Sequence, residues 1–564
     1  MFKVVAIILT WSVLLFSSVF SSAQANTQKG LIYCSESDIY SMNPQRYALS
    51  TTASTISYAV YDRLLTMNPD TKDVGPGIGY LEAIKNNGKT YIFKISKKVQ
   101  FHSNKLFTPS RLLNAEDVAF SFDRLINKDN PFYRPESDFP FIQGSEIIYN
   151  LNKVEALDND SVAFYLKEPS SELIGLLASD NAVILSKEYA DFILKNKLPL
   201  DTLDQNAIGS GPYLQAKFMF KRFVRLNPFM AYHGPKPKLP SLILLHSTYT
   251  NKRLTQLFTG ECHVITNPTP NQMILIESVK DKMNIINRNS LIGTFLIFNT
   301  KNEFFKDKET RRAIASLLNL SEINQMVFFG RGSLQNDLNI KNFNEIKNIK
   351  IEEENKVSTL PDHISRFTEN KEYKAALIKG VTEEEKQNAI KLLKKANGIS
   401  LFVFERNNLG FNNHIKIAQI IKSDLEQYGI KVNIRTFRSN YGLKRMHQGN
   451  FDMALINVFS DYNTIIEPLV KCHNYNKKNT KDFSQNFTKW CNKDVDILYE
   501  SIHDMPSSSE KIATLNEINE ILYSQMPLVP LIYSNNKFVA SNKVKGTEAT
   551  PYGGMSFINA YLEP

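Results

Sequence analysis

The sequence contains no apolar run long enough to cross a membrane. The run Val4–Phe16 follows the basic start Met1-Phe2-Lys3 and precedes Ala23-Gln24-Ala25, a small-x-small pattern. A transmembrane helix needs about 20 apolar residues, so this run is too short to span a bilayer. The arrangement is typical of a secretory signal peptide, and we expect residues 1–25 to be removed on export to the periplasm.

Cysteine is scarce, and none stands where a lipid anchor would need it, because Leu31-Ile32-Tyr33 precedes Cys34. We therefore expect no lipid anchor. Four cysteines in an exported chain indicate two disulfides. Cys472 and Cys491 are close enough in sequence to close a short loop, which would leave Cys34 to pair with Cys262. Spacing alone leaves the other two connectivities open.

Motifs of common enzyme classes are also missing. Ser210 lies in Ile-Gly-Ser-Gly-Pro, which lacks the outer glycines of the G-x-S-x-G elbow. Gly88-Lys89-Thr90 lacks the leading glycine of a phosphate-binding loop, because Ala83 takes its place. No histidine lies in an H-E-x-x-H motif, and Cys472-His473 is better explained by a disulfide than by zinc. We predict a protein that is not an enzyme and has no metal or cofactor.

What the sequence does contain is a long, basic chain. Removal of 25 of the 564 residues leaves about 539, which is too many for a single core and indicates two or more lobes. Lys and Arg exceed Asp and Glu by 67 − 57 = 10, and loss of Lys3 leaves +9. This balance favours an anionic partner or surface. The alternative is a generally basic composition, because the charges look scattered along the chain.

One stretch near the C-terminal end shows where a ligand would bind. Met453–Val458 is mainly apolar and has the pattern of a strand buried in a parallel sheet. Phe459-Ser460-Asp461-Tyr462 follows at once, and in open α/β sheets ligands bind outside the carboxyl ends of strands. Phe459, Ser460, Asp461 and Tyr462 are therefore candidate ligand-binding residues.

The residues before this strand predict its topology. Residues 400–405 have strand character, apolar residues recur at helical spacing over 418–428, and residues 430–434 alternate as in a strand. Strand, helix and strand in that order imply a crossover with parallel pairing. A helix over 441–448 would then lead to the strand at Met453.

The first half of the chain reads as mixed strands and helices. Residues 31–34 form a predicted strand, Asn87-Gly88 marks a hairpin, and Asn114 caps a helix that has Asp117 at its third position. Gly209 and Gly211 are expected in a tight interlobe turn, since glycine permits positive φ.

Eight segments, taken in this order, carry a specific resemblance. They are YDRLL (61–65), YIFKISKKVQF (91–101), NAEDVAFSFDRL (114–125), IGSGPY (208–213), NPFMAYHGPKP (227–237), TGEC (259–262), FNT (298–300) and RRAIASLLN (311–319). Over nearly its whole length the chain resembles the extracellular solute-binding proteins of peptide ABC transporters. Within that family it is most similar to the SapA-type proteins, which are associated with antimicrobial-peptide resistance in Gram-negative bacteria.

The resemblance implies a two-lobed α/β periplasmic binding protein of type II, with an extra subdomain in the first lobe. We expect residues 26–289 in the first lobe, 290–535 in the second and 536–564 back in the first, with two strands crossing between them. It also implies disulfides Cys34–Cys262 and Cys472–Cys491. The expected function is to trap peptides, including antimicrobial peptides, and to deliver them as a monomer to an inner-membrane permease and its ATPase.

Carried over by residue, the resemblance gives Asp461 the task of receiving the α-amino group of a bound peptide. A buried ammonium needs a fixed carboxylate partner. Val458–Ser460 would pair with an extended peptide as an added strand, and Phe459 and Tyr462 would supply apolar walls. The loop departs from the family pattern at residues 463–466, and a turn or helix-capping role for Asp461 is the alternative.

Other interpretations stay open at this level. Ser35 and Glu36 are further ligand-binding candidates, with a capping or turn role as the alternative. A carrier of haem, or a basic surface that binds nucleic acid through its phosphates, is the alternative to a peptide receptor. Residues 335–373 are rich in Asn, Lys and Glu and read as a polar excursion on the second lobe.

Overall fold

The computed structural model describes most of the chain. The described residues are 30–36, 39–46, 51–68, 74–134, 146–170, 172–332, 382–396, 398–404, 413–437, 445–446, 448–459, 466–472, 486–504, 508–551 and 553–563. The predicted signal peptide and the polar excursion at 335–373 lie outside these ranges. Within them, no helix is both long and apolar enough to cross a membrane.

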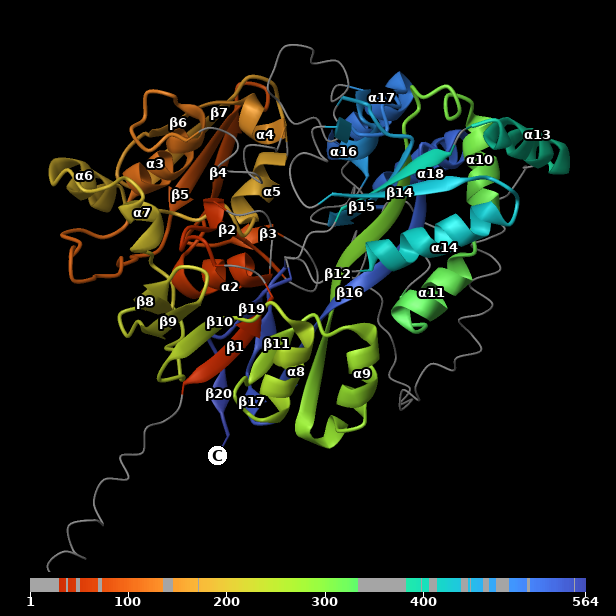
Figure 1. Ribbon diagram of the computed structural model, residues 1–564. Coiled ribbons are helices and arrows are strands. Elements are labelled where there is room, and N and C mark those ends of the chain that lie inside the picture. Colours follow the sequence, from red (N-terminus) through yellow and green to blue (C-terminus); the bar gives the residue numbers. More distant parts are fainter. Residues whose placement is uncertain are drawn as a thin grey trace, which may run out of the picture.

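A ten-stranded sheet runs through the whole molecule (Figure 1). Its strand order is β14-β13-β15-β12-β16-β11-β1-β10-β9-β8. Its longest strands are the neighbours β12 and β16, with 16 and 14 residues. The strands are β1 (Leu31–Ser35), β8 (Tyr213–Met219), β9 (Phe223–Pro228), β10 (Leu242–His246), β11 (Val264–Thr266), β12 (Met283–Phe298), β13 (Ile399–Phe404), β14 (Val432–Phe437), β15 (Met453–Phe459) and β16 (Leu528–Ser541).

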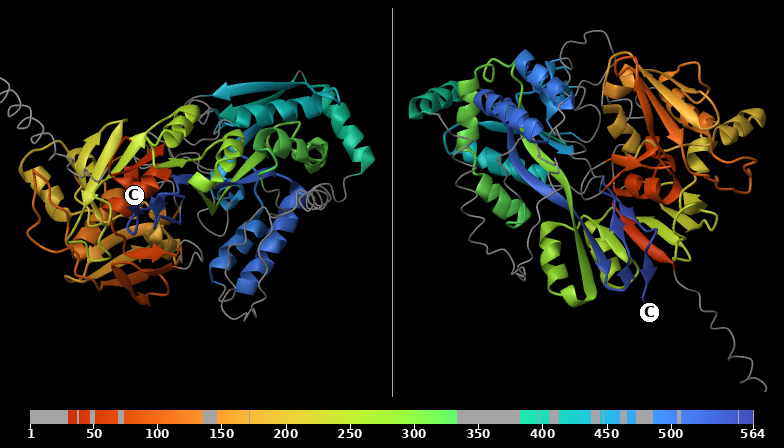
Figure 2. Two further views of the ribbon diagram at one scale, coloured as in Figure 1. Left: turned by 90° about the horizontal axis from the view of Figure 1, so that it is seen from below. Right: turned by 180° about the vertical axis from the view of Figure 1, so that it is seen from behind.

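The antiparallel pair β12–β16 connects two separate sets of hydrophobic cores. The largest core takes its residues from before β12 and from Phe538 onward, whereas two others use residues 295–533. The two-lobed α/β fold expected from the sequence is thereby confirmed, and Figure 2 shows the two lobes from below and from behind. The β12–β16 pairing shifts register between Asn287 and Leu291. The lobe boundaries at 289/290 and 535/536 remain our proposal, and this irregularity supports them.

The first lobe carries an additional four-stranded antiparallel sheet in the order β4-β5-β7-β6. Asn87 and Gly88 have positive φ in the turn between β4 and β5, so the predicted hairpin is confirmed. Asn114 caps α3 in a capping box with Asp117, also as predicted. These strands and α3 are β4 (Gly79–Lys85), β5 (Thr90–Ile95), β6 (Leu151–Ala156), β7 (Ser161–Leu166) and α3 (Ala115–Ile126).

Helices and short strands complete the first lobe. The helices are η1 (Pro44–Arg46), α2 (Thr51–Val60), α4 (Glu146–Asn150), α5 (Glu172–Ala178), α6 (Lys187–Lys195), α7 (Thr202–Gln205), α8 (Thr250–Phe258), α9 (Pro270–Glu277) and η3 (Lys280–Lys282). The short strands pair as β2 (Leu65–Met67) with β3 (Val74–Pro76), β17 (Val544–Lys545) with β20 (Tyr561–Leu562), and β18 (Glu548–Ala549) with β19 (Met555–Ser556).

In the second lobe, β13 pairs in parallel with both β14 and β15, and α14 (His414–Glu426) follows β13. The predicted strand, helix and strand are thus confirmed. The helix predicted over 441–448 is described only at residues 445, 446 and 448, of which 445 and 446 are helical. The other helices are α10 (Lys308–Leu317), α11 (Leu320–Phe328), α13 (Glu383–Lys394), α16 (Glu467–Val470), α17 (Lys493–Asp504) and α18 (Ser508–Gln525).

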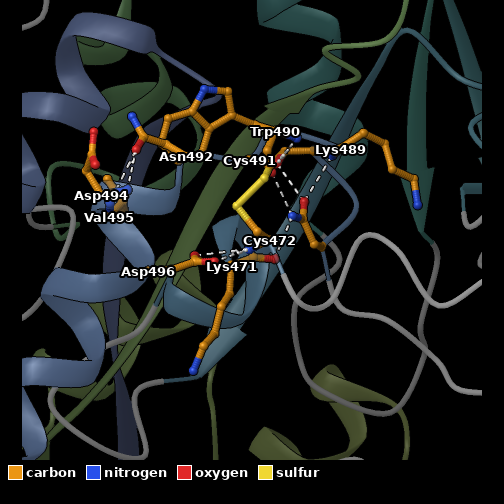
Figure 3. Close-up of a disulfide and its surroundings, with 11 residues drawn as sticks. Lys471, Cys472, Lys489, Trp490, Cys491, Asn492, Asp494, Val495 and Asp496 are labelled. Atoms are coloured by element: carbon orange, nitrogen blue, oxygen red, sulfur yellow. Dashed lines mark hydrogen bonds between the residues drawn. A yellow bond between two sulfur atoms is a disulfide. The ribbon is translucent and has the colours of Figure 1, made fainter.

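Each disulfide lies within one lobe: Cys34–Cys262 in the first and Cys472–Cys491 in the second. Cys34 pairs with Cys262 at a Cα–Cα distance of 5.9 Å, and Cys472 pairs with Cys491 at 4.6 Å. Figure 3 shows the second bridge, where the Cys472 backbone N–H donates to the Asp496 carboxylate at 3.1 Å. This connectivity is the one that the family resemblance implied.

The expectation for Gly209 and Gly211 was wrong in its physical reason. Neither residue has positive φ. Instead, their backbone lies directly against the end of α2, and the Gly211 N–H donates to the Val60 carbonyl at 2.9 Å. A Cβ atom on Gly209 would collide with the same carbonyl oxygen, and one on Gly211 would lie 2.6 Å from the Val60 carbonyl carbon. Glycine is needed here for close approach within the first lobe.

His102 fixes the other side of this glycine segment. Its backbone N–H donates to the Gly209 carbonyl at 2.7 Å, and its ring Nε2 lies 2.8 Å from the Gly211 carbonyl. A carbonyl only accepts, so Nε2 carries a proton. Burial lowers the pKa of His102 to about 4, although the bond to Gly211 opposes this shift.

We expect Gly209→Ala to lower the free energy of unfolding by ~1–3 kcal/mol, because overpacking a fixed backbone contact is destabilising. Gly75→Ala is the matched control, since a Cβ atom there meets nothing within 4 Å. Denaturant unfolding of both variants checks the prediction. Equal midpoints for Gly209→Ala and Gly75→Ala would contradict it.

The lowered pKa of His102 also predicts how stability depends on pH. In the unfolded chain His102 is protonated below about pH 6.5, whereas in the folded chain it is protonated only below about pH 4. The free energy of unfolding therefore falls as the pH drops through this window. We expect His102→Gln, which keeps a donor for Gly211, to remove ~3 kcal/mol of this fall. Unfolding midpoints of wild type and variant between about pH 7 and 4 test this; parallel curves would refute it.

Candidate functional site

The strands of both lobes end opposite the middle of the β12–β16 pair. The last residue of β11, Thr266, pairs with Phe538, which in turn pairs with Ile286. The last residue of β15, Phe459, pairs with Ile292. The two strand ends are thus six residue steps apart along β12, from Ile286 to Ile292, or about 20 Å at ~3.3 Å per step. Ligands of open α/β sheets bind outside such carboxyl ends, so this region is the candidate site.

Among the described residues, one edge of β15 is left unpaired at this site, and we call it the free edge of β15. Its pairing with β13 stops at Val403–Leu455, whereas β15 itself runs on to Phe459. Beyond Leu455, within the described residues, the backbone of β15 pairs only with β12. A strand with one unpaired edge is the geometry that accepts an extended peptide as an added strand.

The second-lobe residues predicted to contact the ligand are Phe459, Ser460, Asp461 and Tyr462. Ser460, Asp461 and Tyr462 lie outside the described residues. Phe459 ends β15, but only its backbone is described. Their role in ligand binding stays a prediction.

Ser35 and Glu36 lie at the carboxyl end of β1 and are buried, with 1% and 2% of their surface exposed. The Glu36 carboxylate accepts from Asn267 Nδ2 at 2.9 Å, from the Thr51 hydroxyl at 3.5 Å and from the Thr266 hydroxyl. These donors come from α2 and from the end of β11. Glu36 therefore ties the ends of β1 and β11 together, and its contact with ligand remains a prediction.

The sequence analysis did not predict a cluster of hydrogen-bonded polar side chains around β15 in the second lobe. Asn457 of β15 accepts from the Thr294 hydroxyl at 2.9 Å and lies 2.7 Å from Nε2 of His414, the first residue of α14. Burial lowers the pKa of His414, so the neutral ring donates through Nε2. The available signal was Asn457 itself, a polar interruption of the apolar run, but its partners are too distant in sequence to be recognised.

A second missed feature joins the two lobes beside the β12–β16 pair. Arg331, just after α11, forms a two-pronged ion pair with Glu277 at the end of α9, at 2.5 and 2.7 Å. Ile276 anchors α9 in the core around the Cys34–Cys262 disulfide, and Val327 anchors α11 in a core of the second lobe. The pair therefore bridges two cores that share no other described ion pair.

Comparison with known proteins agrees with this geometry. Peptide transport periplasmic protein SapA of Salmonella typhimurium is 26% identical over 539 residues, covering 95% of this chain and 92% of the relative. The dipeptide-binding protein of Escherichia coli is 27% identical over 553 residues, covering 97% and 96%. A crystal structure of a Pseudoalteromonas dipeptide-binding protein in complex with Met-Leu has a TM-score of 0.74 and 25% identity, covering 95% and 100%.

The family model for bacterial extracellular solute-binding proteins, family 5 Middle, matches residues 79–478. This range includes the additional sheet of the first lobe, the crossing strand β12 and β15 with its free edge. It therefore covers β11, β12 and β15 of the candidate site, whereas β1 and β16 lie outside the matched range. The chain belongs to the family 5 bacterial extracellular solute-binding proteins.

Proposed function

We propose that the protein is the periplasmic receptor of a peptide ABC transporter. It traps peptides, including antimicrobial peptides, between its lobes and delivers them to an inner-membrane permease with its ATPase. The observation that carries the proposal is the free edge of β15 opposite the strand ends of the first lobe. Relatives named for peptide transport and dipeptide binding support it.

In this proposal, the peptide backbone pairs with residues 456–459 and the lobes close by bending the β12–β16 pair. Backbone pairing gives affinity without requiring particular side chains, which suits a receptor for varied peptides. Asp461 receives the α-amino group, and hydrogen bonds to charged groups are worth ~1.5–3 kcal/mol. Phe459 and Tyr462 flank the peptide, and Ser35 and Glu36 complete the first-lobe side.

The proposal includes export with removal of residues 1–25, no lipid anchor and action as a monomer without catalysis. Chains of this family are solute-binding proteins, in line with the absence of common enzyme motifs from the sequence. Neither a haem carrier nor a nucleic-acid-binding protein gains support from the relatives described above. The peptide receptor is therefore the better-supported function.

We expect Asp461→Asn to weaken binding of peptides with a free N-terminus by ~1–3 kcal/mol and to spare their N-acetylated forms, because only the free ammonium uses the carboxylate. Calorimetry with matched peptide pairs measures both affinities. Asp494→Asn is the control, an exposed carboxylate in the first turn of α17.

Two results would speak against these ideas separately. Equal losses for free and acetylated peptides would remove the amine-binding role of Asp461 but leave the receptor in place. Failure of the wild-type protein to bind any short peptide, together with binding of haem or an oligonucleotide, would overturn the proposed function.

A further inference from the structure

The positive charge of the chain is concentrated, not scattered as its overall composition suggested. Residues 205–260 contain no Asp or Glu. The same stretch contributes +8 to a total formal charge of +10, through Lys217, Lys221, Arg222, Arg225, Lys236, Lys238, Lys252 and Arg253. The structure shows which of these charges gather on one surface.

Four of them lie on the hairpin of β8 and β9, residues 213–228, which we call the basic hairpin. Lys217 and Arg225 are cross-strand partners, and Lys221 and Arg222 form the turn. All four side chains are exposed, whereas alternate residues such as Val224 are buried in the first-lobe core. The hairpin thus turns its basic face to solvent at the sheet edge farthest from β14 (Figure 1).

Among the described residues, no acidic side chain pairs with the cations of this surface. Within the described part of the chain, none of the four cations forms an ion pair, and the Lys217 ammonium lies 5.8 Å from the centroid of the Phe223 ring. The described side-chain contacts of the two lysines are with aromatic rings. The Lys221 ammonium lies 5.0 Å from the Tyr40 ring centroid and 5.4 Å from that of Phe220. Unpaired cations beside one another keep a strong positive potential.

Apolar surface accompanies the charge at the turn. Phe220 is 57% exposed and Tyr40 is 41% exposed, and their rings meet edge to face at 5.9 Å. An exposed aromatic pair at a surface turn that carries Lys and Arg has the composition of segments that rest at a lipid–water interface. Cations meet the headgroup phosphates there, and the aromatic rings enter the headgroup layer.

We propose that the basic hairpin docks the protein on an anionic phospholipid surface. The contact is independent of the ligand site, since three strands separate β9 and β8 from the β12–β16 pair. A docked first lobe leaves the second lobe free to move. The receptor would then search for its permease along the membrane surface, and not through the whole periplasm.

The observations favour a lipid surface over a nucleic acid. Single strands bind in charged grooves and stack their bases on open aromatic faces. Here the cations lie on an exposed hairpin, and Lys221 already lies over the rings of both Tyr40 and Phe220. A lipid surface requires no open ring face, because it needs only exposed apolar edges beside cations.

Vesicle co-sedimentation of the full mature chain tests the proposal. We expect binding to phosphatidylcholine vesicles that contain about 30% phosphatidylglycerol, none to pure phosphatidylcholine, and weaker binding as salt rises. Lys221→Gln with Arg222→Gln should lower the partition coefficient about 25-fold, at about fivefold per cation. Lys236→Gln with Lys238→Gln is the matched control, because it removes the same charge from the loop at the opposite end of β9.

A second pair of variants tests the apolar contact. Phe220→Ser should weaken vesicle binding several-fold, and Phe258→Ser, at the exposed end of α8, should not. Thermal melts confirm that each variant folds. Equal loss in the hairpin and control variants, absence of binding to anionic vesicles, or binding to an RNA or DNA oligonucleotide without binding to vesicles would each overturn the proposal.

Discussion

The backbone ladder between β12 and β16 is the constraint on which the architecture depends. Each lobe extends this pair on a different side, the first through β11 on β16 and the second through β15 on β12. Hydrogen bonding therefore fixes how far apart the facing strand ends lie. The ladder is interrupted between Asn287 and Leu291, midway between those ends. If the two strands bend at this irregularity, the angle between the lobes changes while the hydrogen-bonded sheet within each lobe stays intact.

The covalent and ionic links are distributed in a way that permits this bending. Each disulfide joins two cysteines of one lobe, one disulfide in each lobe, so neither links the first lobe to the second. The Glu277–Arg331 pair does join them, but the Glu277 side chain is 40% exposed and that of Arg331 is 26% exposed. Solvent screens such a pair, and its net value is ~1 kcal/mol or less. It can restrain one relative position of the lobes and still release them.

The sequence predicts those structural features that depend on residues close together in the chain. The β13-α14-β14-β15 order follows from periodicity, and the Asn114 cap follows from a side chain that bonds its own helix. The Glu277–Arg331 pair and the His414–Asn457 contact could not be predicted, because folding brings together residues 54 and 43 positions apart. For Gly209 the residue type was informative, but the cause was a neighbouring helix end and not the local backbone angle.

The same reasoning separates the two carboxylates that the sequence nominated for ligand binding. Glu36 is buried and already accepts from Thr51, Thr266 and Asn267, so an incoming ammonium would have to compete with three neutral donors held in place by α2 and β11. A carboxylate in that state is better suited to shaping the first-lobe edge than to recognising charge. In the proposed receptor, charge recognition therefore falls to the second lobe and to Asp461. The first lobe contributes a preformed edge against which the peptide closes.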